Sequence, residues 1–263
     1  MSHYLKLVDF EMKRFWKIYA FLLASVLVIQ PITVFVLLKA KQEYIQKNPL
    51  EDYYLAYFSS NSVFFHLPIM ICLATLTLYI FFTWYREWFG KSTFSIQLLM
   101  LPFNRMTVYY AKLTALLLFI FGGLVTQIGS YYVVYGIYMA MYPQFSSLDN
   151  SLVSWLNADQ ILFALIPTNI VDFFLYYGLG IVAVIVLFTV ILLERSFRYK
   201  GIITGVIFVI ICILLFFVPN YINDKVISLY ENEILLGRIA ISFCIAAGSL
   251  WLSHYLIKKK IWV

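Results

Sequence analysis

The sequence is short of charge: aspartate, glutamate, lysine and arginine together make up 12% of its 263 residues. An ordinary soluble domain carries about 25%. Hydrophobic residues fill 63% of the positions, and the mean hydropathy is +0.88. A chain of this composition has too few polar side chains to cover a surface that faces water. Its main solvent is therefore lipid.

Cysteine is also scarce, and its scarcity excludes a disulfide scaffold. The three cysteines, Cys72, Cys212 and Cys244, all fall inside apolar runs. We expect them to act as small buried hydrophobic residues, and we predict no metal site. Long polar stretches are missing too, since none exceeds about 30 residues, which is too short for a core that is stable alone. We predict a single transmembrane domain over residues 1–263.

Six long apolar runs separate the few charged positions. A helix needs about 20 residues to cross the hydrocarbon core, and these runs lack the period-two alternation of barrel strands. The predicted spans are 18–38, 63–84, 113–142, 172–193, 201–218 and 239–257. The fold prediction is an all-α polytopic membrane protein with six transmembrane helices.

Residues 1–17 carry a different pattern. Leu5, Val8, Met12 and Phe15 recur at spacings of three and four, while Lys6, Asp9, Lys13 and Lys17 occupy another face. This pattern predicts an amphipathic helix that lies in the headgroup layer and leads into the first span. An ordinary charged tail is the alternative.

Three segments lie on the side of the membrane away from the two termini, and they differ in character. Residues 39–61 are polar, and we expect a flexible loop. Residues 160–166 are apolar but too short to cross, so we expect a dipping or interfacial helix. Residues 219–238 carry three acidic residues and are expected to form another loop.

The basic residues indicate the orientation. With six spans both termini lie on one side, and that side holds fourteen of the 19 lysines and arginines. They are Lys6, Lys13, Arg14, Lys17, Arg86, Lys91, Arg105, Lys112, Arg195, Arg198, Lys200, Lys258, Lys259 and Lys260. Because positive residues stay in the cytoplasm, both termini are predicted to be cytoplasmic, in a bacterial plasma membrane. The net charge of +6 then reflects topology, and nucleic acid is not an expected partner.

Residues 85–112, YREWFGKSTFSIQLLMLPFNRMTVYYAK, form a charged segment between the second and third spans. Phe94, Leu98 and Leu101 recur at spacings of four and three, which predicts a short helix ended by Pro102. The segment is either a lever that docks on a soluble protein or a turn that rests on lipid, and the pattern favours neither. Gly90-Lys91-Ser92 matches the end of a phosphate-binding loop, but Tyr85 stands where that motif needs its first glycine. Any ATP is therefore expected to bind to a partner.

The same segment resembles the permeases of the type-2 ATP-binding-cassette exporter family. In that family the second span runs into R-E-x-x-G-T, then L-L, P-x-x-R and a K-L pair that enters the third span. The matching residues here are Arg86, Glu87, Gly90, Thr93, Leu98, Leu99, Pro102, Arg105, Lys112 and Leu113. The chain departs from the pattern at Lys91-Ser92 and at Phe103-Asn104. The resemblance in motif covers about 28 residues, whereas the six-span plan covers the whole chain.

The resemblance implies a division of labour. Arg86–Leu101 would be a cytoplasmic coupling helix, and Arg86, Glu87, Gly90, Thr93, Phe94, Leu98, Leu99, Pro102 and Arg105 would couple the chain to an ATPase. Soluble ATPase subunits would bind ATP and magnesium, so this chain would hold no cofactor and no catalytic site. Two permease chains, identical or different, would pair to enclose a path for an amphipathic or hydrophobic cargo such as a peptide or an antibiotic.

Polar residues within the spans are the remaining candidates for function. Asp172 stands at the edge of the fourth span, where it can cap the helix, although an acid in the membrane is by default a functional candidate. Gln127, His66 and His254 are interpreted as lone polar groups. Gly201 and Gly205 show the spacing of closely packed helices, within the chain or across a dimer.

Two other functions compete with an exporter subunit. An intramembrane enzyme would need clustered histidine and acidic residues, which the sequence does not place together. A sensory or immunity membrane protein without transport would share the same spans. Copurification with a soluble ATPase separates these alternatives.

Overall fold

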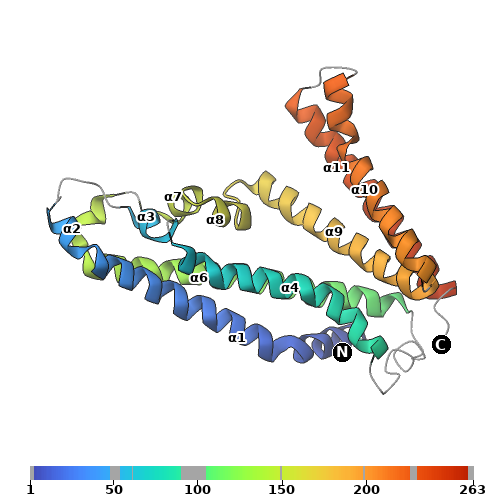
Figure 1. The fold of residues 1–263 in the computed structure, drawn as a ribbon, viewed down its shortest axis with the longest axis horizontal. Coiled ribbons are helices and arrows are strands. Elements are labelled where there is room, and N and C mark those ends of the chain that lie inside the picture. The colour runs from blue at the N-terminus through green and yellow to red at the C-terminus, as the bar shows by residue number, and fades with distance from the viewer. Residues whose placement is uncertain are drawn as a thin grey trace. The chain divides into compact units, whose positions relative to one another are not determined.

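The computed structural model describes residues 3–47, 54–60, 62–89, 105–148, 150–197, 199–225 and 230–259. Within these ranges every regular element is a helix (Figure 1). The helices are α1 (His3–Ala40), α2 (Gln42–Lys47), α3 (Leu55–Ser60), α4 (Val63–Phe89), α6 (Met106–Met141), the 3-10 helix η1 (Pro143–Ser147), α7 (Leu152–Asn157), α8 (Gln160–Leu165), α9 (Ile170–Phe197), α10 (Tyr199–Lys225) and α11 (Glu231–Lys259).

Six of these helices, α1, α4, α6, α9, α10 and α11, are long and apolar enough to cross a membrane. They contain the six runs predicted from the sequence. The prediction of an all-α polytopic membrane protein is therefore confirmed.

The helices are longer than the apolar runs that predicted them. α1 begins at His3 and continues without a break through residue 17 into the first span. Val8 and Phe15 are buried on it, Met12 is half-buried and Leu5 is exposed, so the predicted apolar face is buried only in part. Lys6, Asp9 and Lys13 are exposed, as the pattern predicted. At the far end, α10 and α11 take up most of the predicted loop at 219–238. Helical hydrogen bonding continues past a hydrophobic run wherever the next residues tolerate it.

The predicted flexible loop at 39–61 is wrong for its described residues. It contains α2 and α3, and Ile45, Leu55 and Phe58 are buried there. Six-residue helices are too short to show a period in the sequence, and tertiary packing holds them. The short helix expected at 160–166 is present as α8.

The chain divides into two compact units, here called unit 1 and unit 2. Unit 2 comprises Val8–Thr77 and Ala115–Phe173, and unit 1 comprises Met1–Leu7, Leu78–Thr114 and Phe174–Val263.

In unit 2, the ends of α1, α4 and α6 pack with the short helices α2, α3, α7 and α8 (Figure 1). Their common core is aromatic: Trp155 lies 5.2 Å from the ring of Tyr131 and 6.0 Å from that of Phe65. Tyr142, the last residue of the predicted third span, donates a hydrogen bond to the carbonyl of Leu38. The third span therefore ends inside the packed core of unit 2.

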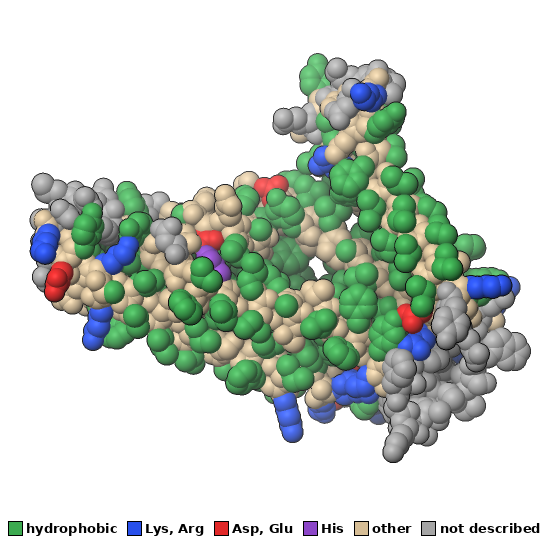
Figure 2. Space-filling view, viewed as in Figure 1, with side chains coloured by type: hydrophobic (Ala, Val, Ile, Leu, Met, Phe, Trp, Pro, Cys, Tyr) green, Lys and Arg blue, Asp and Glu red, His purple; other side chains and the backbone are tan. Residues whose placement is uncertain are grey.

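In unit 1, α10 and α11 lie side by side, and their outer faces are covered with hydrophobic side chains (Figures 1 and 2). The turn into α10 is tight, because a Cβ at Gly201 would meet the backbone of Leu193 and Glu194. A Cβ at Gly205 would come within 3.0 Å of the side chain of Val190. The predicted close packing at Gly201 and Gly205 therefore occurs within the chain, between α9 and α10.

Candidate functional site

The predicted coupling segment begins and ends on described helices. Arg86 and Glu87 lie near the end of α4, where Arg86 is exposed, and Arg105 stands just before α6. The other predicted coupling residues, Gly90, Thr93, Phe94, Leu98, Leu99 and Pro102, lie outside the described residues. What the structure adds is how the two flanks are held.

Lys112 ties α6 to α4. Its Nζ donates a hydrogen bond of 2.9 Å to the carbonyl of Thr83 and lies 5.4 Å from the centre of the Trp84 ring. The residue is 1% exposed. The sequence placed Lys112 at the return to lipid, where a lysine would reach for headgroups. Instead its charge is stabilised inside the unit by a carbonyl and an aromatic face.

Tyr85 ties α4 to α9. Its hydroxyl donates to the carboxylate of Glu194, and the guanidinium of Arg195 lies 4.6 Å from the centre of its ring. Neighbouring acidic and basic side chains on α9 thus hold one tyrosine from both sides. The contact fixes the last turns of α4 just before residue 90.

The rings of Tyr109 and Phe188 complete this arrangement. We call it the flank clamp, and its residues are Thr83, Trp84, Tyr85, Tyr109, Lys112, Phe188, Glu194 and Arg195. Phe188 of α9 lies 5.5 Å from Trp84 of α4 and 5.4 Å from Tyr109 of α6, both edge to face. Such pairs add about 0.5–1.5 kcal/mol each beyond their buried area. The clamp therefore joins the parts of α4, α6 and α9 that belong to unit 1.

The flank clamp includes residues that the sequence did not single out. Thr83, Tyr109 and Glu194 come from three helices that are far apart in the chain, and no spacing rule joins them. One signal was available: aromatic residues gather at both ends of the 85–112 segment, which is typical of the membrane interface.

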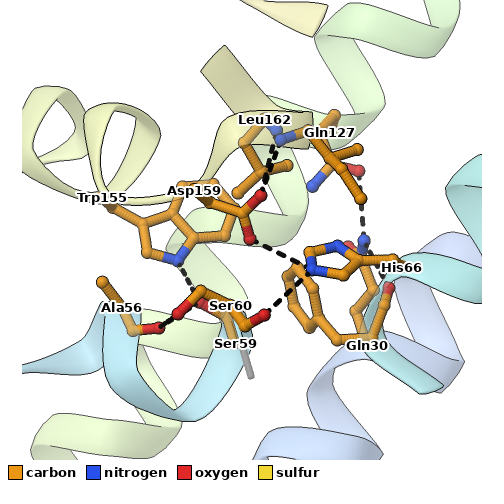
Figure 3. Close-up of polar contacts among 11 residues, drawn as sticks. Gln30, Ala56, Ser59, Ser60, His66, Gln127, Trp155, Asp159 and Leu162 are labelled. Carbon is orange, nitrogen blue, oxygen red and sulfur yellow. Dashed lines mark hydrogen bonds and ion pairs between the residues drawn. The ribbon is translucent and has the colours of Figure 1, made fainter. Parts of the chain in front are cut away.

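Unit 2 holds the candidate residues Gln127 and His66, and the interpretation of both as lone polar groups is wrong. The side-chain nitrogen of Gln30 of α1 donates a 3.2 Å hydrogen bond to Gln127 of α6 (Figure 3). It also lies 3.4 Å from the carbonyl of Phe65 of α4, to which it donates. The side-chain oxygen of Gln30 accepts a hydrogen bond from Ser130. Gln30 is fully buried. In lipid, polar side chains that pair across helices fix which helices associate and in what register.

His66 faces Asp159, with 3.2 Å between Nε2 and a carboxylate oxygen (Figure 3). The same nitrogen lies 3.4 Å from the carbonyl of Ser60. Both neighbours are acceptors, so Nε2 carries the proton. The other oxygen of Asp159 accepts from the backbone of Ile161 and Leu162, which caps α8. The pair thus fastens a short helix to the first turn of α4.

Nδ1 of His66 is buried without a hydrogen-bond partner among the described residues. The nearby hydroxyl of Ser59 accepts from the indole of Trp155 at 2.9 Å. Over the described ranges, no group of three or more histidine, cysteine or acidic residues could hold a metal ion.

Asp172 lies in the first turn of α9, where its carboxylate accepts a 3.0 Å hydrogen bond from the side chain of Asn169. A negative charge in the first turn is favourable to the helix dipole. Asp172 therefore lies at the end of a helix, next to the polar side chain of Asn169.

No family model, no curated protein and no solved structure matches the chain. The flank clamp and the sequence of the segment that it holds are therefore the grounds for a functional proposal.

Proposed function

We propose that the chain is the membrane-spanning permease subunit of an ATP-driven exporter of the type-2 ATP-binding-cassette class. The observation that carries the proposal is the flank clamp, which locks α4, α6 and α9 together at the base of residues 90–104. A segment that only turned at the membrane surface would not need a buried lysine and a paired tyrosine at its two ends. A segment on which an ATPase exerts a force does need such contacts, because the force has to be transmitted to the spans.

In this proposal, soluble ATPase subunits in the cytoplasm bind ATP and magnesium and press on residues 86–101. The chain itself contributes no catalytic group. Two permease chains, identical or different, enclose the path in a bacterial plasma membrane, with all termini cytoplasmic. The bundle alternates between two arrangements, and ATP binding biases the choice because the ATPase grips the two arrangements with different affinity.

The cargo in this proposal is an amphipathic or hydrophobic molecule such as a peptide or an antibiotic. The aromatic content, with 24 Phe and 21 Tyr, fits such a cargo. Aromatic side chains offer large apolar contacts with few rotatable bonds.

The test is loss of coupling through a single apolar contact. We purify the tagged chain with its ATPase from membranes and measure ATP hydrolysis in proteoliposomes. Leu98→Asp should remove the bound ATPase and lower the hydrolysis at least about tenfold, because a carboxylate in an apolar contact costs more than the 1.4 kcal/mol that this factor represents.

Gln97→Asp is the matched control, since it adds the same charge one position away from the predicted apolar face. It should keep at least half of the wild-type hydrolysis. Equal hydrolysis in the wild type and in Leu98→Asp, or a wild-type chain that carries no ATPase, would contradict the proposal.

A further inference from the structure

A cavity of about 470 Å³ lies in unit 1 where the start of α6 meets the end of α11. The described residues that line it are Arg105, Met106, His254, Ile257 and Lys258. His254 and Lys258 are one helical turn apart, so they share a face of α11. Two of the five lining side chains are cationic and a third is an imidazole, and none is acidic.

Arg105 lines the cavity, and its Nη1 donates a 3.3 Å hydrogen bond to the carbonyl of Ile257. Among the described residues this contact uses one of the five N–H donors of the guanidinium. That contact orients the planar group, and an oriented guanidinium is the preferred side chain for a phosphate.

The sequence around the cavity supplies no negative charge. Residues 90–104, before Arg105, and residues 259–263, after Lys258, contain no aspartate or glutamate. The positive groups at this place are therefore not balanced by acidic neighbours in the sequence.

Aromatic residues place this end of α11 at a membrane interface. The rings of Trp251 and Tyr255 are stacked with their centres 6.3 Å apart, and Trp251 is 72% exposed. Lys259 Nζ lies 5.3 Å from the centre of the Tyr255 ring. Tryptophan, tyrosine and lysine together mark the level of the lipid headgroups. The cavity is therefore at the depth at which phospholipid phosphates lie.

We propose that this cavity binds a phosphate group, with Arg105 as the planar donor, Lys258 as the point charge and His254 as a further N–H donor. The source that fits the position best is the headgroup of an anionic phospholipid, since basic pockets between transmembrane helices bind such headgroups. A soluble phosphate ester offers the same chemistry. The proposal requires the chain to be in a membrane and does not depend on the exporter function.

The experiment uses the full chain in detergent with phosphatidylglycerol and phosphatidylcholine of identical acyl chains at equal concentration. Native mass spectrometry counts the lipids that stay bound. The wild type should retain phosphatidylglycerol at least about fivefold over phosphatidylcholine. The variant Arg105→Gln/Lys258→Gln should lose that preference, whereas the conservative variant Lys258→Arg should keep it.

Lys259→Gln is the matched control, because Lys259 is adjacent on the same helix and does not line the cavity. It removes a positive charge from the same end of α11 and should keep the wild-type preference. If the double variant does not purify as a monodisperse protein, the single variant Lys258→Gln replaces it under the same criteria.

Addition of millimolar glycerol phosphate separates the two sources of phosphate. Loss of bound phosphatidylglycerol would identify a soluble phosphate ester as the ligand, and retention would identify the lipid. An equal preference in the wild type and the double variant would overturn the proposal. So would an equal loss in Lys259→Gln, which would assign the effect to overall charge.

Discussion

The two ends of the chain use their transmembrane helices in different ways. In the most apolar stretch of α6, 44% of the residues are buried, and α1 and α4 are similar at 33% and 39%. In α10 and α11 the figure is 11%. The first three helices pair buried polar side chains with one another, and α11 meets Thr189 of α9 through Ser249 and Ser253. Apart from such contacts, α10 and α11 present apolar residues to their surroundings (Figure 2).

The difference shows where helix association is specified. Lipid is as apolar as leucine, so hydrophobic faces alone do not choose a partner helix. Gln30, Gln127 and Ser130 do choose, because each would be an unpaired polar group in hydrocarbon if its partner moved away. The outer faces of α10 and α11 specify no such neighbour within the chain.

Replacement of a tryptophan by alanine, once in unit 2 and once on α11, should give the largest difference in stability. Trp155 is 1% exposed in the core of unit 2, whereas Trp251 is 72% exposed on α11. Trp155→Ala should lower the free energy of unfolding by about 3–5 kcal/mol, because it leaves a cavity and removes the indole N–H that Ser59 accepts. Trp251→Ala should change it by about 1 kcal/mol or less.

Unfolding by SDS in mixed micelles measures both tryptophan variants. Similar losses of stability in the two would mean that the burial contrast between unit 2 and α11 has no energetic counterpart.

A second pair of variants sharpens the contrast within unit 1. Gly201→Ala would place a methyl group against the backbone of Leu193 and Glu194, and we expect a loss of about 1–3 kcal/mol from overpacking. Gly248→Ala on α11 meets nothing within 4 Å and should stabilise the helix by up to about 1 kcal/mol. Thermal unfolding of the two purified variants decides between them, and a neutral Gly201→Ala would contradict the tight turn.

The smallest expected effect is the coupling between Gln30 and Gln127. Hydrogen bonds between transmembrane helices average about 0.6 kcal/mol and reach about 1.7 kcal/mol. A double-mutant cycle with Gln30→Leu and Gln127→Leu should give a coupling energy in that range. Additive effects of the two substitutions would show that the pair does not hold α1 to α6.

The sequence predicted what depends on long periodic segments and missed what depends on contacts. All six spans were predicted, because each is a continuous apolar run. α2 and α3 were missed, because six residues are too few to show a period. The partners of Gln127 and His66 were missed as well, since Gln30 and Asp159 are each more than 90 positions away in the chain and only folding brings them together.

In the candidate site, too, local features were predicted from the sequence and contacts between distant residues were not. The sequence singled out residues 85–112 from charge and motif, because those are local properties. It predicted that Lys112 marks the entry to the third span, but it did not predict that Lys112 is buried against Thr83 and Trp84. A lysine that satisfies its charge on a distant carbonyl leaves no local signal.

The hydrogen bond from Lys112 to Thr83 closes the intervening chain into a loop whose ends are fixed. The entropy of closing a loop rises only with the logarithm of its length, so doubling the loop costs about 0.6 kcal/mol. Insertions and deletions in this stretch that spare α4 and α6 are therefore cheap for the fold. Evolution can lengthen or trim this loop to suit a new neighbour while the spans beneath it keep their register.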